Sequence, residues 1–230
     1  MKDQSRNGPS IHGQEERRAV DLLIFDLDCT LADTKLDIAL ATNYALRALG
    51  LPQLPPQTIY GYIGNGVEKI LERALPSAHQ HLRDEALRLF SEHYGQHLLD
   101  HTRLYPKVRE TLEHFRTKKM AVATNKTLRF SLQTLEGLQI RHYFQLVLGG
   151  DSTDHLKPNP EPLQRILQAL QVTPHRAAMV GDSVSDVLAG KRAGTLTCAL
   201  TYGLGKREDL LASGPDYLAD DFGALVHFFE

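Results

Sequence analysis

The chain has 230 residues, of which 42% are hydrophobic and 23% are charged, and its formal net charge is −2 at pH 7. That length suits one large domain, or a domain with a smaller one inserted, around a substantial core. The near-neutral charge offers no basic field, so we expect neither nucleic acid nor a membrane surface as a partner. The 2 cysteines make no disulfide framework or zinc cluster, and no apolar run is as long as a membrane span. Without a recognisable secretory signal, the chain is expected in the cytoplasm.

The chain begins with a polar segment and then a short apolar run. Residues 1–18 are of mixed charge, which predicts a flexible N-terminal tail. Residues 22–25 are typical of a fully buried strand, and Asp26 and Asp28 follow at its end. Side chains alternate along an extended chain, so the two carboxylates can point into one pocket. They repel each other unless a proton or cation lies between them, and Mg²⁺ is the simplest such cation. The alternative is a loop that happens to be acidic.

The next part of the chain has a helical pattern. Apolar residues recur at helical spacing in four segments, at residues 35–49, 57–61, 67–75 and 82–99. Asp33 or Thr34 can cap the first of these helices. No credible strand interrupts the pattern up to about residue 103. A small all-helical unit, residues 35–103, is therefore expected after the first strand.

From residue 104 onward, strands alternate with helices. Strands are expected at residues 120–124, 146–148, 177–180 and 196–200 and near Tyr217. Helices are expected at residues 107–117, 128–138, 161–170, 184–193 and 222–229. Alternation of this kind predicts parallel strands joined by right-handed crossovers, which is a doubly wound α/β sheet. Residues 19–34 and 104–230 are assigned to this core.

More polar residues follow the later strands. Thr124 and Asn125 end one strand, Asp182 and Asp186 follow another, and Lys157 lies in a proline-rich loop. Each has a purely structural alternative: a turn or cap, a solvated lysine, or a favourable charge at a helix N-terminus. However, the carboxyl ends of parallel strands meet at one edge, where open α/β sheets bind ligands. Together the residues indicate a ligand site there.

In this combination, the chain resembles the phosphatases of the haloacid dehalogenase superfamily. The matching motifs are Asp26-Leu27-Asp28-Cys29-Thr30, Ala123-Thr124-Asn125, Lys157-Pro158, and Gly181-Asp182-Ser183 with Asp186. The resemblance extends from residue 21 to nearly the end of the chain and implies a Rossmann-like core with an inserted helical cap. Within the superfamily the chain most resembles the phosphoglycolate phosphatases, through segments such as Ile63-Gly64-Asn65-Gly66, Lys157-Pro158-Asn159-Pro160 and Leu200-Thr201-Tyr202-Gly203.

The resemblance implies a Mg²⁺-dependent hydrolase of a small phosphomonoester, with 2-phosphoglycolate as the favoured substrate. Asp26 would attack phosphorus and form an aspartyl phosphate, while Lys157 neutralises charge. Asp28 would protonate the leaving oxygen and then activate water. Mg²⁺ would be held by Asp26, Asp182 and the main-chain carbonyl of Asp28. Asp186 would act through an ordered water or by orienting the site.

The remaining implied roles concern the phosphoryl group and the cap. Thr30 would position Asp28. The expected ligands of the phosphoryl oxygens are Thr124, Asn125 and the main-chain amides after Asp26, including that of Leu27. The cap would close over the site and exclude water. Asn65 and Lys69 are candidates for contacting the substrate, and the alternative is that they lie on an exposed helix face.

Two further features have a structural explanation. Cys29 stands where the family usually has glycine, and it is expected to be a small buried side chain in a site with intact chemistry. A cysteine-phosphatase loop is excluded because Lys35, not arginine, lies six residues later. His93, His97 and His101 share a helical spacing that can bind metal, but Gly95 weakens that helix, and a solvated face is favoured.

Several alternative functions stay open. They are a phosphatase for another small phosphometabolite or for pyrophosphate, an isomerase of the β-phosphoglucomutase type, and a catalytically silent binding module. The four motifs are shared by the phosphatase and the isomerase, so the cap residues decide between them. The silent module is disfavoured because Asp26, Asp28, Lys157 and Asp182 are all present. The oligomeric state is expected to be a monomer or a homodimer.

Overall fold

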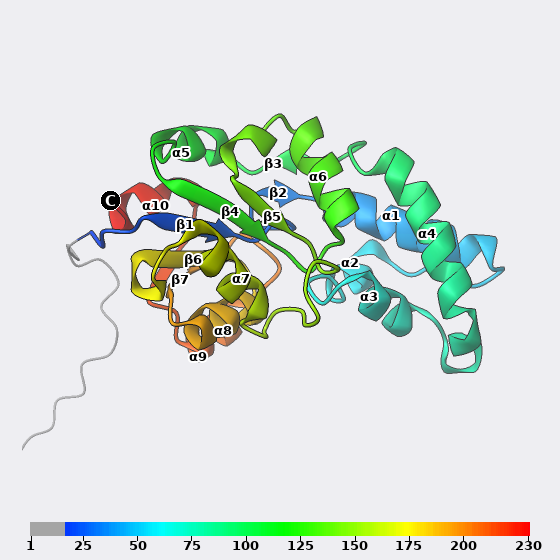
Figure 1. Ribbon diagram of the computed structural model, residues 1–230. Helices are drawn as coiled ribbons and strands as arrows, with labels where there is room; N and C mark the ends of the chain where they lie inside the picture. The colour runs from blue at the N-terminus through cyan, green and yellow to red at the C-terminus, as the bar shows by residue number, and fades with distance from the viewer. Residues whose placement is uncertain (1–16) are drawn as a thin grey trace, which may run out of the picture.

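A parallel sheet forms the centre of the molecule. The computed structural model describes residues 17–230 and contains a 6-stranded sheet with the strand order β5-β4-β1-β6-β7-β8 (Figure 1). These strands are β1 Leu22–Phe25, β4 Lys119–Ala123, β5 Leu146–Leu148, β6 Ala177–Gly181, β7 Leu196–Leu200 and β8 Tyr217–Ala219. All pairings between them are parallel, and β1 lies between β4 and β6. The predicted α/β class with a parallel sheet is confirmed.

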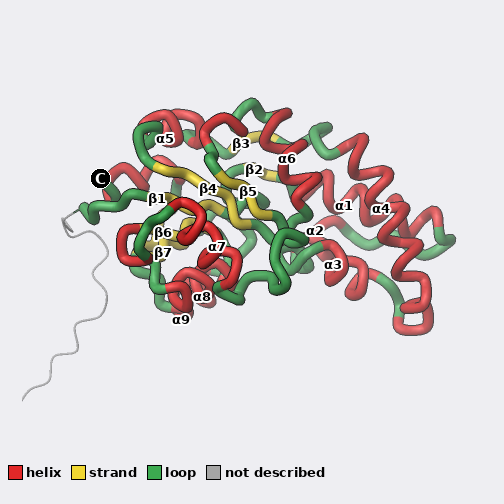
Figure 2. Tube along the Cα trace, viewed as in Figure 1, coloured by secondary structure: helices red, strands yellow, loops and turns green. Residues whose placement is uncertain are grey.

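Helices cover both faces of the sheet (Figure 1, Figure 2). Leu23 and Phe25 of β1 face a cluster that includes residues of α5 Val108–His114, α6 Leu128–Gly137 and α10 Leu225–Phe228. Leu22 and Ile24 face the opposite cluster, with residues of α7 Glu161–Leu170 and α8 Val184–Ala193. All four residues of β1 are fully buried. The short run reads as continuously apolar because both of its faces are covered.

Four helices pack together beside the sheet and form the cap. They are α1 Lys35–Ala48, α2 Pro56–Tyr60, α3 Val67–Ala74 and α4 Arg83–His97. They share an apolar cluster, which Phe130 of α6 joins from the core, and in Figure 1 they extend from one end of the core. The 3-10 helix Ser77–Leu82 connects α3 to α4. The segment predicted to be helical therefore has its own small hydrophobic core.

The chain enters and leaves the cap at one place. Strand β2, Ala32–Asp33, pairs antiparallel with β3, Arg103–Leu104. Asp37 in the first turn of α1 accepts hydrogen bonds from the main-chain N–H groups of His101 and Thr102, at 3.0 and 2.8 Å. The entering and leaving segments are thus joined by a strand pair and by a buried carboxylate.

Several details of the structure differ from the expectations. The strand pair of β2 and β3 and helix α9, Arg207–Ser213, are not among the expected elements. Thr34 precedes α1 but makes no side-chain cap, because its hydroxyl donates to Asp28 instead. The predicted flexible tail lies outside the described residues except for its last two, of which Arg18 pairs with Phe229.

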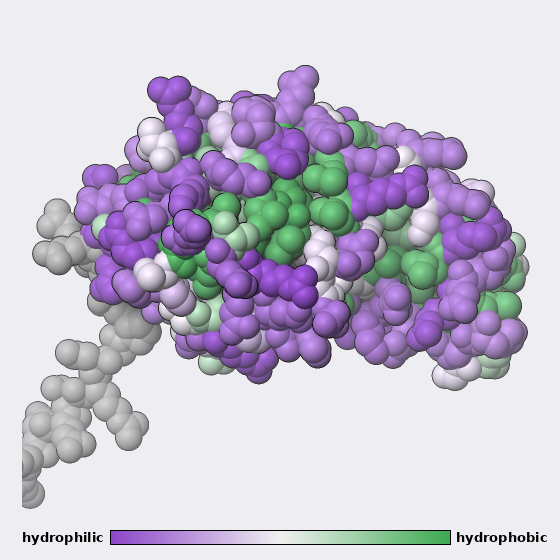
Figure 3. Space-filling view, viewed as in Figure 1, coloured by the Kyte–Doolittle hydropathy of each residue, from purple (hydrophilic) through white to green (hydrophobic). Residues whose placement is uncertain are grey.

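The visible surface in Figure 3 is mainly hydrophilic. Hydrophobic side chains reach it near the edge strand β5 and helix α6. No helix within residues 17–230 is long and apolar enough to cross a membrane. The expected cytoplasmic location and the expected monomeric or dimeric state stay predictions.

Candidate active site

The carboxyl ends of three adjacent strands bring the predicted residues together. Asp26 directly follows β1, Thr124 follows β4, and Asp182 follows β6. Because β1 lies between β4 and β6, segments almost 160 residues apart in the chain meet at one edge. All three side chains are buried. The three strands thus form the floor of the candidate site.

Three carboxylates form a buried acidic group at this edge. Asp26, Asp182 and Asp186 each offer an oxygen atom, and these atoms all lie within 4.8 Å of one another. Burial raises the pKa of Asp182 to about 7, and the charges of Asp186 and Asp26 act in the same direction. Burial likewise raises the pKa of Asp26 to about 6, although Lys157 opposes the rise. The group therefore fits a divalent cation, which would relieve the repulsion between its oxygens.

Lys157 provides the positive charge beside this group. Its Nζ lies 2.9 Å from Asp26 Oδ1 and 2.6 Å from Asp186 Oδ1. Burial alone would lower the pKa of Lys157, but the charges of Asp186 and Asp26 outweigh it and hold the pKa above its ordinary value. The lysine is therefore charged and bridges two members of the acidic group.

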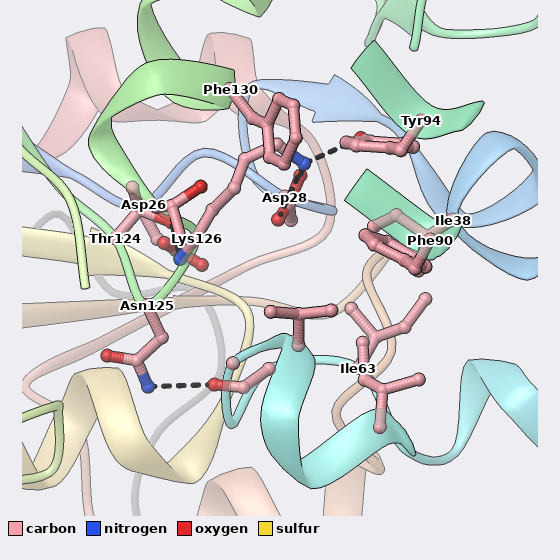
Figure 4. A pocket seen from close by; sticks show the side chains of 15 residues that line it. Asp26, Asp28, Ile38, Ile63, Phe90, Tyr94, Thr124, Asn125, Lys126 and Phe130 are labelled. Carbon is pink, nitrogen blue, oxygen red and sulfur yellow. Dashed lines mark hydrogen bonds and ion pairs between the residues drawn. The ribbon is translucent and has the colours of Figure 1, made fainter. Parts of the chain in front are cut away.

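Asn125 holds the loop that carries Lys157. Its Oδ1 accepts from the main-chain N–H of Lys157 at 2.9 Å, and its Nδ2 donates to the main-chain oxygen of Lys157 at 3.0 Å. The same Nδ2 donates to the main-chain oxygen of Gly64 in the cap at 2.8 Å (Figure 4). Both amide protons are therefore used by main-chain oxygens in this arrangement. A contact of Asn125 with a phosphoryl group stays a prediction.

Asp182 and Asp186 are held in place from both sides. Asp186 and Ser183 form a capping box at the start of α8. Asp186 therefore also stabilises the N-terminus of this helix, which was the structural alternative to a role in a ligand site. Asp182 Oδ2 accepts from the main-chain N–H of Leu204 at 2.8 Å. A Cβ atom at Gly203 would stand 2.4 Å from the Asp182 carboxyl carbon, so only glycine fits there.

The hydroxyl of Thr30 has a different partner from the expected one. Thr30 was expected to position Asp28, but its hydroxyl donates to Asp182 Oδ1 at 2.8 Å. Thr34 takes the expected role instead, because its hydroxyl donates to Asp28 Oδ1 at 2.7 Å. The short turn after Asp28 explains the difference, since it directs the Thr30 side chain towards β6.

Asp28 has two further neighbours, Lys126 and Tyr94. Lys126 Nζ donates to Asp28 Oδ1 at 3.0 Å and to the hydroxyl of Tyr94 at 2.6 Å (Figure 4). Lys126 directly follows the Thr124-Asn125 motif, and that adjacency was the available signal. Tyr94 lies on α4, 66 residues from Asp28 in the chain, and no sequence pattern marks it.

A pocket lies between the core and the cap. Its cavity is about 40 Å³, which is room for a few water molecules or a small ligand. The core side is polar and includes Asp26, Asp28, Thr124 and Lys126. The side formed by the cap is mostly apolar, through Ile38, Ile63, Val67, Ile70 and Phe90 (Figure 4). The site therefore combines charged groups at the sheet edge with a small, largely apolar lid.

Three other predicted residues have distinct positions. The main-chain N–H of Leu27 has no acceptor among the described residues and is free for a phosphoryl oxygen. Lys69 is exposed, pairs with Glu72 at 2.7 Å, and does not line the pocket. Asn65 is also exposed and does not line this pocket. Substrate contacts of Asn65 and Lys69 stay predictions.

The three histidines at helical spacing do not form a shared site. His93 stacks on His97, with ring centroids 4.3 Å apart, and His97 pairs with Asp100. His101 is directed to Asp37. Among the described residues, the single group arranged like a metal site is the acidic one above.

Cys29 is buried in an unusual backbone conformation. Its φ is +64°, in the left-handed region that favours glycine, and burial raises the pKa of its thiol well above the ordinary value. The side chain is 1% exposed. It is therefore a buried apolar group, as expected, and not a nucleophile.

Replacing Cys29 by glycine tests the cost of this conformation. Alanine is normally more stabilising than glycine, but at positive φ that order reverses. We expect Cys29→Gly to unfold with a free energy about 1 kcal/mol higher than Cys29→Ala, as measured by urea titration. An alanine variant that is the more stable of the two would contradict the strain assigned to Cys29.

Comparison with known proteins agrees with this geometry. Residues 23–200 match the model of the family described as haloacid dehalogenase-like hydrolases. A phosphoglycolate phosphatase of Vibrio parahaemolyticus is 40% identical over 218 residues, which cover 90% of this chain and 95% of that protein. One from Aquifex aeolicus is 39% identical and covers 91% and 96%.

A solved structure extends the likeness to three dimensions. The crystal structure of a protein from Haemophilus somnus, described as a predicted phosphoglycolate phosphatase, is 34% identical, with a TM-score of 0.85 over 90% of this chain and 96% of that chain. The sheet, the cap and the strand-end residues described above thus occur in a chain whose sequence matches the family over most of its length. The chain belongs to the haloacid dehalogenase-like hydrolases.

Proposed function

We propose that this hydrolase is a Mg²⁺-dependent phosphatase that cleaves 2-phosphoglycolate through an aspartyl-phosphate intermediate. The observation that carries the proposal is the buried set formed by Asp26, Lys157 and the acidic group, next to Asp28 and beneath a small pocket. Such a set suits the transfer of a charged phosphoryl group, because it supplies a nucleophile, a cation and a site for a metal.

The residues divide the reaction into two steps. An oxygen of Asp26 attacks phosphorus, the bond from phosphorus to the substrate oxygen breaks, and Asp28 gives its proton to that leaving oxygen. In the second step Asp28 takes a proton from water, the water oxygen attacks phosphorus, and the bond to Asp26 breaks. Lys157 holds Asp26 and offsets negative charge throughout. Mg²⁺, held by Asp26, Asp182 and the main-chain oxygen of Asp28, would neutralise the charge of the phosphoryl oxygens.

The pocket favours a short substrate. The cavity is small, about 40 Å³, and its cap side is mostly apolar. A sugar phosphate carries several hydroxyl groups, which would lie unpaired against Ile63, Val67 and Phe90 at a cost in free energy. This observation supports a small phosphoester over the substrate of a β-phosphoglucomutase. The names of the relatives from Vibrio parahaemolyticus and Aquifex aeolicus point to 2-phosphoglycolate.

A substrate panel tests the proposal. Phosphate release is measured from 2-phosphoglycolate, pyrophosphate and an aryl phosphate, with Mg²⁺ or with a chelator. We expect kcat/KM for 2-phosphoglycolate to exceed that of the other two by about 100-fold or more, and activity to vanish with the chelator. Equal rates on all three would reject the substrate, and formation of glucose 6-phosphate from β-glucose 1-phosphate would favour the mutase. An absence of turnover would favour the silent binding module.

Mg²⁺ is expected to stabilise the folded chain. A ligand that binds only the native state, at 100 times its Kd, adds about 2.7 kcal/mol. For a chain of this size that corresponds to a Tm increase of about 5–10 °C, measured by thermal unfolding at pH 8. Asp182→Asn should abolish most of this increase, because it removes one member of the acidic group.

The matched control is Asp209→Asn. Asp209 is an exposed carboxylate in the first turn of α9 and is not part of the acidic group. This variant should keep the full increase of Tm with Mg²⁺. Equal Mg²⁺ responses in the two variants would show that the ion binds elsewhere.

A further inference from the structure

Lys126 is a buried cation that faces the pocket. It is the only positively charged residue among the described residues that line it. Its side chain is 6% exposed. Its Nζ lies 3.0 Å from Asp28 Oδ1 and 2.6 Å from the Tyr94 hydroxyl. The lining of the pocket therefore contains one cation, held between a carboxylate of the core and a hydroxyl of the cap.

Tyr94 places a hydroxyl beside that charge. Its ring packs on Phe90 of the cap and on Phe130 of α6 in the core, with both centroid distances at 5.2 Å, so the side chain is fixed between the two units. The hydroxyl accepts a hydrogen bond from Lys126, and its own proton has no acceptor within residues 17–230. Burial raises the pKa of Tyr94 to about 12, so the hydroxyl keeps that proton. A buried donor without an acceptor is costly unless a ligand completes it.

The position of Asp28 relates this pair to the reaction. In the proposed function, Asp28 protonates the oxygen that leaves from phosphorus. Lys126 Nζ lies 3.0 Å from Asp28 Oδ1, on the side of the cap. In 2-phosphoglycolate, the leaving oxygen is separated from the carboxyl carbon by one methylene group. Because Lys126 Nζ and the leaving oxygen would both contact the Asp28 carboxylate, a substrate carboxylate one methylene group away would lie within reach of Lys126.

We infer that Lys126 and Tyr94 together bind the carboxylate of the substrate and thereby set the selectivity of the enzyme for a short carboxylated phosphoester. This inference rests on the proposed function. An ammonium has three N–H donors, and Lys126 directs them to the Tyr94 hydroxyl and to the two oxygens of Asp28, at 3.0 and 3.3 Å. The substrate carboxylate would replace the longer of the two contacts with Asp28. Because Lys126 belongs to the core and Tyr94 to the cap, the carboxylate would be held by one group from each.

The test compares two substrates that differ only at the carboxylate. Ethyl phosphate has a methyl group where 2-phosphoglycolate has its carboxylate. The measured quantity is the ratio of kcat/KM for the two substrates. We expect Lys126→Met to lower this ratio by about 100-fold and Tyr94→Phe to lower it by about 10-fold, since each loses a buried hydrogen bond to a charged group. Any effect on Asp28 is common to both substrates and cancels in the ratio.

Two other lysines complete the experiment. Lys119→Met is the matched control, because Lys119 begins β4, at the opposite end of the strand that leads to Lys126. Its ratio should equal that of the wild type. Lys69→Met tests the cation that the sequence suggested in the cap. A ratio that falls in Lys69→Met but not in Lys126→Met would overturn the assignment.

The remaining outcomes distinguish a failure of the inferred carboxylate site from a failure of the proposed substrate. Equal losses on both substrates in Lys126→Met would mean that Lys126 only positions Asp28, and would overturn the carboxylate site alone. A wild type without preference for 2-phosphoglycolate would reject the proposed substrate and this site with it. If Lys126→Met does not fold, as judged by circular dichroism, Tyr94→Phe decides, because it removes one oxygen and keeps the packed ring.

Discussion

Asp26→Asn is expected to lower kcat by about 10⁴-fold or more. The asparagine amide has nearly the shape of the carboxylate, but it is a poor nucleophile and cannot form the acyl phosphate. The change also removes the charge that Lys157 pairs with at 2.9 Å, while Lys157 keeps its pair with Asp186. Because burial raises the pKa of Asp26, loss of its charge should not destabilise the fold. Phosphate release and thermal unfolding measure the two effects separately.

The chain offers a matched control for this substitution. Asp21 directly precedes β1, whereas Asp26 directly follows it, and the exposed Asp21 pairs with Arg176. Asp21→Asn should retain activity within about twofold, since exposed ion pairs contribute little. Acid quenching of the wild type during turnover should trap phosphate bound to protein, and Asp26→Asn should trap none. Activity of Asp26→Asn above about 1% of the wild type would contradict the assigned nucleophile.

The core of the fold was predictable because its signals are local. β1 is a continuous apolar run that is buried on both faces. The alternation of strands and helices after the cap predicts a parallel sheet, which the structure has. The acidic site was also predictable, because parallel strands bring their carboxyl ends to one edge whatever their separation in sequence. Helix α9 was missed because it is only 7 residues long and follows a glycine-rich segment.

Contacts between the core and the cap were not predictable. Which face of a cap helix meets the core depends on how the cap packs. In α3, Ile70, Leu71 and Ala74 are buried in the cluster of the cap, which leaves Lys69 exposed beside Glu72. Packing also explains the contact of Tyr94 with Lys126, because the apolar residues of α4 that lie in the same cluster fix the orientation of the helix. Helical spacing shows which residues share a face, but it does not show which face the core covers.

The hydrogen-bond partners of hydroxyl groups near the acidic site were also not predictable from the sequence. Thr30 and Thr34 are both close to Asp28 in sequence, and both are able to donate to it. The tight turn after Asp28 decides between them, since it directs Thr30 to Asp182 and leaves Thr34 for Asp28. Asn125 is a similar case, because its amide holds the main chain of Lys157. Residue types and spacing predicted which residues gather, whereas the donor-acceptor pairs required the backbone path.

Lys157→Met is expected to lower kcat by about 10³-fold and to destabilise the chain without metal. Lys157 is 3% exposed and lies between Asp26 and Asp186. Methionine has a similar length and no charge, so the acidic group would lose its only close cation among the described side chains. Removal of one partner from a buried ion pair costs about 3–5 kcal/mol. Loss of a charge that stabilises the transferring phosphoryl group accounts for the effect on kcat.

The loss of stability should depend on pH in a defined direction. Burial raises the pKa of Asp26 to about 6 and that of Asp182 to about 7, from an ordinary value of 3.8. From the ordinary pKa up to these raised values, the native state therefore binds more protons than the unfolded state. Stability in chelator therefore falls as pH rises through this range, and it falls more without Lys157. Urea titrations of Lys157→Met and the wild type should differ most above pH 7 and least below pH 5. The control Lys119→Met should show a constant difference from the wild type, and a constant difference for Lys157→Met would contradict its place in the acidic group.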